Sequence, residues 1–218
     1  MKKLISLLIV TALGASVFTA CAGNTAETAA PEETAAVAET QAAEEAFSYE
    51  MTDDLNNLFA AAMEGWVGAN YEPVAYLGVP ADNPLGSSFL CKATAVVPDA
   101  VPYYAIVTVQ DVGDSVTVED VQVIDYAASS TASEAVFAAD NGEGAMLGAW
   151  EDAASEDLTG AVTAEGVTPV AVLATQLVSG TNYCCLTRND ANDGWNLTYV
   201  YQDLQGGAEV TNTAALGI

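Results

Sequence analysis

The feature that most constrains the fold of this chain is an internal repeat with a period of roughly 95 residues. Pro73 and Gly86 are 13 positions apart, and their counterparts Pro169 and Gly180 are 11 apart. A period of this length is that of a small domain, because solenoid repeats run only about 20 to 50 residues. We therefore expect two similar folded units in tandem. The segments that return in the same order are 73–77 as 169–173, 86–91 as 180–185, and 110–112 as 202–204.

Each repeat has the pattern of a helix followed by strands. In the first repeat, residues 53–68 carry apolar side chains at helical spacing, and Thr52 or Asp53 is suited to cap the first turn. The second repeat has a less regular helical pattern over 145–162. Strands are predicted from runs of β-branched and aromatic residues at 74–78, 88–97, 103–110 and 115–124, then at 170–178, 181–188, 195–202 and 208–216.

These patterns predict an α+β fold class with two tandem units, each a helix packed on a four-stranded antiparallel sheet. The units are expected at 48–126 and 143–218, and residues 127–142, which are small and polar, are expected to be the linker. A unit of about 80 to 90 residues is long enough to bury one modest core.

The N-terminal end has the three parts of an export signal. Lys2 and Lys3 precede an apolar run at 4–10, and Phe-Thr-Ala-Cys at 18–21 is a small-residue cleavage site. This pattern resembles a bacterial lipoprotein signal with its lipobox. The resemblance implies that signal peptide 1–20 is removed, that Cys21 receives diacylglycerol, and that the protein is extracytoplasmic and anchored by lipid to the bacterial membrane. A membrane-spanning helix, the alternative, needs roughly 20 apolar residues, more than this stretch offers.

Residues 21–47 follow as a segment of Ala, Glu and Thr, with no large apolar residue before Phe47. Such a segment cannot bury enough apolar surface to offset the entropy of ordering it. It is expected to be a disordered stalk between the lipid anchor and the folded part.

The charge of the chain excludes several classes of function. Its formal net charge is -26, and Lys92 and Arg188 are the only basic residues after the signal. Such a protein repels nucleic acid. The sequence contains no histidine, so the Ser-His and Cys-His pairs of familiar hydrolases are absent. We expect no enzyme activity and no cofactor.

The second repeat contains a short motif, Gln-Leu-Val-Ser-Gly-Thr-Asn-Tyr, at 176–183. It resembles the Gln-x-Val-x-Gly first hairpin of cystatins, and residues 199–207 stand where cystatins have their second hairpin loop. The resemblance implies a cystatin-like fold and two loops that enter the active-site cleft of papain-like cysteine peptidases. Carried over by position, the loop residues are Gln176, Val178 and Gly180 in the first hairpin, and Leu204, Gln205 and Gly206 in the second.

The remaining cysteines and the acidic loop at 189–194 do not predict a metal site. Cys91 and Cys185 are equivalent in the repeat and lie in apolar strands, which favours small buried side chains. With Cys184 the count is odd, so a disulfide between the repeats and a free thiol both remain open. The acidic loop lacks the glycine and glutamate register of an EF-hand and is better explained as a turn.

We therefore expect a noncatalytic surface protein that acts as a binding or structural module. A protein or peptide ligand is left open, and so is inhibition of papain-like peptidases through the hairpin at 176–180.

Overall fold

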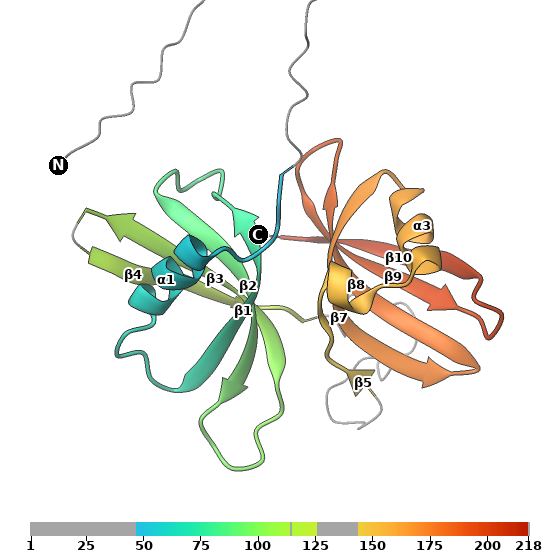
Figure 1. Cartoon of the computed structure of the whole chain (residues 1–218), viewed down its shortest axis with the longest axis horizontal. Helices are drawn as coiled ribbons and strands as arrows, with labels where there is room; N and C mark the ends of the chain where they lie inside the picture. Colours follow the sequence, from blue (N-terminus) through green and yellow to red (C-terminus); the bar gives the residue numbers. More distant parts are fainter. Residues whose placement is uncertain (1–46, 114, 126–143, 218) are drawn as a thin grey trace, which may run out of the picture. The chain divides into compact units, whose positions relative to one another are not determined.

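The computed structural model describes residues 47–113, 115–125 and 144–217 (Figure 1). The described residues belong to one compact unit, and they form two antiparallel sheets. The predicted signal peptide at 1–20, Cys21, the stalk up to residue 46 and the linker at 127–142 lie outside the described residues.

The first sheet follows a single helix, α1 (Asp53–Ala62). The Thr52 hydroxyl caps this helix by accepting a hydrogen bond from the backbone N–H of Leu55. Four strands then form an antiparallel meander in chain order, so each strand pairs with the next one. They are β1 (Ala69–Gly78), β2 (Gly86–Ala95), β3 (Tyr103–Val112) and β4 (Ser115–Val123).

The second sheet has six strands, and two short helices lie in the sequence between β6 and β7. The two-residue strands β5 (Gly144–Ala145) and β6 (Gly148–Ala149) both pair with β7. Helix α2 (Trp150–Ala153) has Ala154 as its C-cap, and Ser155 then caps helix α3 (Glu156–Thr163). The order β10-β9-β8-β7 completes the sheet with β7 (Val167–Val178), β8 (Gly180–Asn189), β9 (Trp195–Gln202) and β10 (Ala208–Leu216).

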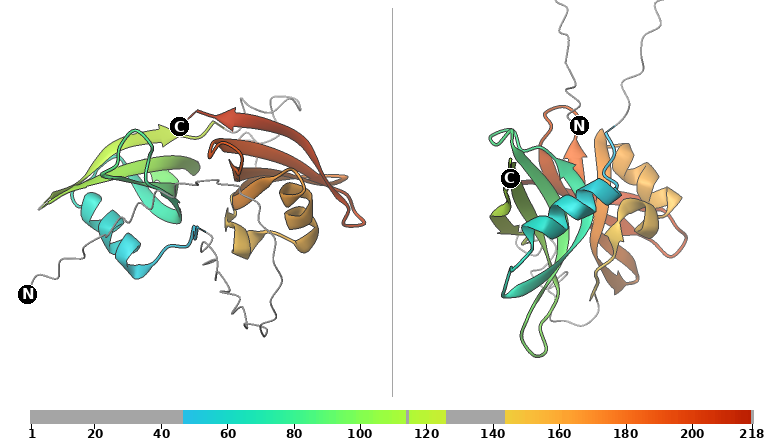
Figure 2. Two further views of the ribbon diagram at one scale, coloured as in Figure 1. Left: turned by 90° about the horizontal axis from the view of Figure 1, so that it is seen from above. Right: turned by 60° about the vertical axis from the view of Figure 1, so that its left-hand side comes forward.

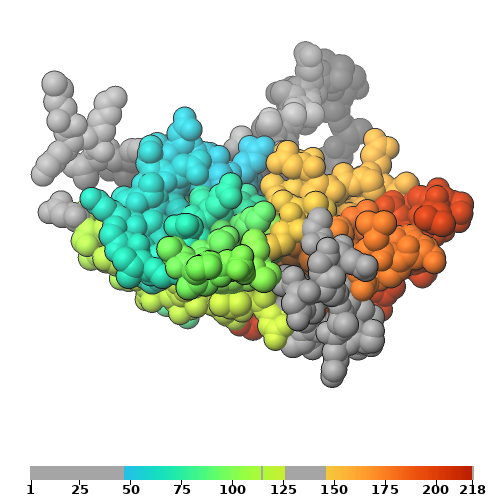
Figure 3. Space-filling model, turned by 90° about the horizontal axis from the view of Figure 1, so that it is seen from below, coloured from blue at the N-terminus to red at the C-terminus, as the bar shows by residue number. Residues whose placement is uncertain are grey.

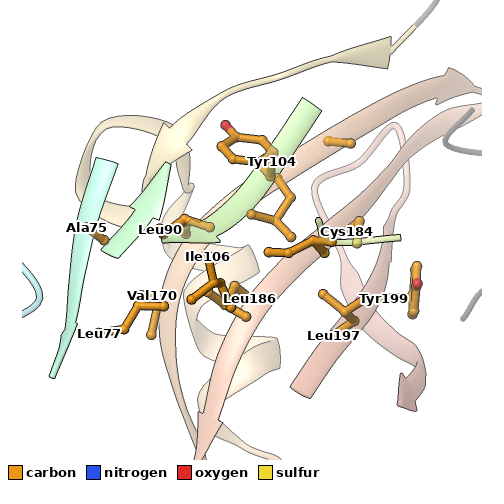
Figure 4. Close-up of a cluster of buried hydrophobic side chains, with 14 residues drawn as sticks. Ala75, Leu77, Leu90, Tyr104, Ile106, Val170, Cys184, Leu186, Leu197 and Tyr199 are labelled. Atoms are coloured by element: carbon orange, nitrogen blue, oxygen red, sulfur yellow. The ribbon is translucent and has the colours of Figure 1, made fainter. Parts of the chain in front are cut away.

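One hydrophobic cluster joins the two sheets. Leu90 and Ile106 of the first sheet lie in the same cluster as Leu186 and Leu197 of the second (Figure 4). Neighbouring residues along a strand point to opposite faces, so this cluster occupies one face of each sheet. The whole cluster comprises Ala75, Leu77, Leu90, Tyr104, Ile106, Ile124, Val170, Ala171, Leu173, Ala174, Cys184, Leu186, Leu197 and Tyr199.

The opposite face of each sheet is covered by its own helix. Phe59 and Ala62 of α1 pack with Phe89 and Val107 of the first sheet. Helix α3 contributes Leu158 and Val162 to a separate cluster on the second sheet. Figure 2 shows α1 beside the first sheet and α3 beside the second.

The predicted fold class, α+β with two tandem cystatin-like units that each pack a helix on a four-stranded sheet, is therefore wrong. The described residues are mostly β, and helices account for about 15% of them. The helix predicted at 53–68 ends at Ala62, and the one predicted at 145–162 is two short helices broken at Ala154. In addition, the two sheets bury side chains in one shared cluster as well as in the separate cluster under each helix. The eight predicted strands do correspond to β1–β4 and β7–β10.

None of the helices in the described ranges is long and apolar enough to cross a membrane.

Candidate functional site

Among the described residues, both sheets line a cavity of about 820 Å³. Figure 3 shows residues of the first sheet, in green, directly against residues of the second half of the chain. The first half contributes Leu77, Gly78, Val79, Pro80, Ala81, Asp82, Asn83, Ser88, Ile106, Thr108, Glu119, Asp120 and Gln122, and the second contributes Arg188, Asp193 and Trp195.

The strand register places a row of small and polar residues along the cavity. Gly78 pairs with Ser88, Ser88 with Thr108, and Thr108 with Asp120. All four line the cavity, since residues directly opposite each other in a sheet share a face. The hydroxyls of Ser88 and Thr108 lie 3.0 Å apart and share a hydrogen bond. This row therefore presents two hydroxyls and one carboxylate to the cavity.

A β-bulge brings two consecutive carboxylates to the same cavity. Thr108 pairs with Asp120 and Val109 with Val118, so Glu119 is the extra residue on β4. In a regular strand, Glu119 and Asp120 would point to opposite faces. A bulge redirects one side chain, and both residues line the cavity. The Glu119 carboxylate accepts a hydrogen bond from the Asn83 amide.

Arg188 is the one positively charged side chain in the lining of this cavity. Its Nη2 atom lies 3.2 Å from Oδ1 of Asp193, whose side chain is 80% exposed. Its guanidinium carbon lies 5.8 Å from the ring centres of both Phe47 and Trp195, within the range of a cation–π contact. The buried Nε atom has no hydrogen-bond partner among the described residues. The guanidinium thus contacts one exposed carboxylate and two aromatic rings.

The residues Phe47–Tyr49, called here the aromatic segment, connect the two sheets beside the cavity. Tyr49 accepts a backbone hydrogen bond of 2.9 Å from Tyr76 of β1, and its ring lies edge-on to Trp195 of β9 at 6.2 Å. Burial raises the pKa of the Tyr49 hydroxyl, and a hydrogen bond with Arg188 acts in the opposite direction. The Phe47 ring stacks on Tyr76.

The predicted peptidase-binding residues lie in two neighbouring turns of the second sheet. Gln176 and Val178 end β7, Gly180 begins β8, and Leu204, Gln205 and Gly206 lie between β9 and β10. The turns are linked, because the Tyr201 hydroxyl donates a 2.6 Å hydrogen bond to the carbonyl of Ser179. The tips are apolar and exposed: Leu177 is 71% exposed, Leu204 is 77% exposed, and Val178 is also exposed.

Gly180 has a structural role that makes it a poor site for testing the loop. Its φ is +138°, and a Cβ there would collide with the backbone oxygen of Gln202 and lie 2.9 Å from the Tyr201 side chain. Gln176 also serves the hairpin, because its side-chain oxygen accepts a hydrogen bond from Asn182. The exposed contact surface of these turns therefore comes from Leu177, Val178 and Leu204, of which Leu177 was missed at the level of sequence.

Sequence reasoning also missed the cavity itself. The sequence identifies Arg188 only as one of the two basic residues after the signal, and no motif relates it to a cavity. The available signal in the sequence was that Arg188 is followed within seven residues by Asp190, Asp193 and Trp195 at a turn. The polar row and the bulge at Glu119 depend on strand register, which the repeat does not specify.

Within the described ranges, no group of three or more His, Cys, Asp or Glu side chains is arranged to hold a metal ion. Cys91, Cys184 and Cys185 are all buried free thiols. Comparison of the chain with protein-family models, with curated proteins and with solved structures gives no match.

Proposed function

We propose that this protein is an exported, lipid-anchored and noncatalytic binding protein, and that the cavity between its sheets is the ligand site. The observation that carries the proposal is the cavity of about 820 Å³, which both halves of the chain line. Ligand sites are typically concave spaces of about 300 to 1,000 Å³ with a few placed polar groups. The Ser88–Thr108 row and Arg188 are groups of this kind.

The absence of histidine from the sequence favours binding over catalysis. The hydroxyls that line the cavity have no imidazole to activate them as nucleophiles. The anchor is inferred from the lipobox pattern ending at Cys21. The first described residue, Phe47, lies against cavity-lining Gly78, so the stalk would leave the folded part next to the ligand site.

The anchor is tested by metabolic labelling with an alkyne fatty acid and by membrane fractionation. We expect the wild type to be labelled and membrane-bound, and Cys21→Ser to be unlabelled. Equal labelling of the two proteins would contradict lipidation at Cys21.

The ligand site is tested by a thermal-shift screen with amino acids, short peptides, sugars and polyamines. A ligand that binds only the folded state raises the melting temperature. Ala81→Trp places a large ring on the exposed loop that lines the cavity, and Ala60→Trp makes the same change on the exposed side of α1, outside the cavity. We expect a ligand to stabilise the parent and Ala60→Trp but not Ala81→Trp. Equal stabilisation of both variants would place the ligand elsewhere.

Inhibition of a papain-like peptidase is a second candidate, favoured by the two linked turns with exposed apolar tips. The activity would need only contacts that block a cleft. We expect Val178→Asp and Leu204→Asp to weaken inhibition at least tenfold. Val112→Asp is the matched control and should leave inhibition unchanged. Val112 is the repeat counterpart of Leu204 and is 55% exposed in the first sheet. An unchanged inhibition constant for Leu204→Asp, or no inhibition by the parent at micromolar concentration, would exclude this candidate.

A further inference from the structure

From the two kinds of charge in the cavity we infer that its ligand is a zwitterionic amino acid or short peptide with a free ammonium group and a free carboxylate. The inference rests on the proposed function, since it names the ligand class of the same cavity. It assigns the carboxylate to Arg188 and the ammonium group to Glu119 and Asp120.

The first half of the chain supplies the negative charge. Asp82, Glu119 and Asp120 line the cavity, and none of them forms an ion pair with a described basic residue. The bulge on β4 directs both Glu119 and Asp120 to this space. A cleft lined by charges of one sign concentrates ions of the opposite sign, so these residues favour a cationic group.

The second half supplies the positive charge. The planar guanidinium of Arg188 has a geometry that matches a carboxylate. Its partner Asp193 makes a single contact of 3.2 Å from an exposed position, and exposed ion pairs contribute only about 0 to 1 kcal/mol. A ligand carboxylate can therefore replace or join Asp193 at Arg188 at little cost. The rings of Phe47 and Trp195 hold the guanidinium in place.

A ligand with one kind of charge would fit only part of this lining. A polyamine would pair with the carboxylates but would be repelled by Arg188. A dianion would be repelled by the four carboxylates of the lining. Between the two kinds of charge, the Ser88 and Thr108 hydroxyls, which also bond to each other, offer donors and acceptors suited to a peptide bond. Asp82 on the loop adds to the excess of negative charge.

The test is isothermal titration of the protein with trialanine and its two capped forms. Acetyl-trialanine lacks the ammonium group, and trialanine amide lacks the carboxylate. We expect trialanine to bind and each capped form to bind at least tenfold more weakly. Alanine, titrated in parallel, distinguishes a free amino acid from a peptide as the preferred ligand.

Variants assign the two contacts. Asp120→Asn is expected to weaken binding of trialanine and of the amide but not of acetyl-trialanine, and Arg188→Gln is expected to show the converse selectivity. Asp111→Asn, an exposed carboxylate outside the lining, is the control and should leave all three affinities unchanged. The capped peptides on the wild type test the inference even if Arg188→Gln fails to fold.

Three results would overturn the inference. Equal binding of trialanine and its amide would show an organic-cation site, and equal binding of the acetylated form would show an anion site. No binding of alanine or trialanine would also overturn it. If the thermal-shift screen nevertheless finds a sugar that Ala81→Trp excludes, the proposed binding function stands and only the ligand class is wrong.

Discussion

At the scale of single residues, the three cysteines in the described residues are too deeply buried to react with thiol reagents. Cys91, Cys184 and Cys185 each lie in a different hydrophobic cluster, so they do not form a disulfide with one another. Burial raises the pKa of all three thiols above the ordinary value of 9.0. We expect native protein to leave these thiols unmodified by Ellman's reagent at pH 8, and urea-unfolded protein to react at all three. Fast reaction of the native protein would contradict the described burial.

The same shifts predict how stability depends on alkaline pH. The folded state favours the neutral thiol, so this contribution is present below the unfolded pKa near 9.0 and is lost as the pH rises above it. The free energy of unfolding is expected to fall above pH 9, and to fall less in Cys91→Ala. Urea titrations at several pH values measure both. The odd cysteine count in the sequence left a disulfide open, because pairing depends on which face of which sheet each residue occupies.

At the scale of elements, the aromatic segment at Phe47–Tyr49 is expected to stabilise the contact between the sheets. Tyr49→Ala removes a half-buried ring that touches Trp195 and loses its hydrogen bond with Arg188. We expect a loss of about 1 to 3 kcal/mol in the free energy of unfolding, measured with urea. Val67→Ala, at an 85% exposed site, is the control and should change it by less than about 0.5 kcal/mol. Similar effects of the two substitutions would show that the segment does not connect the sheets.

Strands were easier to predict than helices for a physical reason. The strand runs are rich in β-branched and aromatic residues, and turn residues mark their ends. The helices end where local backbone preferences compete with the apolar pattern: Gly65 adopts a φ of +78° after α1, and Ser155 starts a new cap after Ala154. The bulge at Glu119 has no counterpart in the sequence pattern, because it arises from the pairing of β3 with β4.

At the scale of the whole molecule, the repeat predicted two units but not the core that they share. Residues 170–174 form a continuous apolar run, and all five are buried. Such a run is typical of a strand covered on both faces, so it was the available sequence signal for the shared core. A repeat indicates which segments resemble each other. The surface by which the two sheets contact each other depends instead on which apolar face of each sheet its helix leaves uncovered. The boundaries 48–126 and 143–218 remain a prediction of where one half ends and the next begins.

The shared cluster predicts that neither half is stable alone. A protein of residues 48–125 would expose Leu77, Leu90 and Ile106, and one of residues 144–217 would expose Leu186 and Leu197, all of which are buried in the complete chain. Exposure of several large apolar side chains costs about 1.5 to 3 kcal/mol each, against a typical total stability of 5 to 15 kcal/mol. We expect each half to bind the dye ANS and to lack a cooperative thermal transition, and the complete chain to unfold in one transition. A sharp transition in either half would mean that its own helix-side cluster suffices for folding, and that the shared cluster is an interface between two domains.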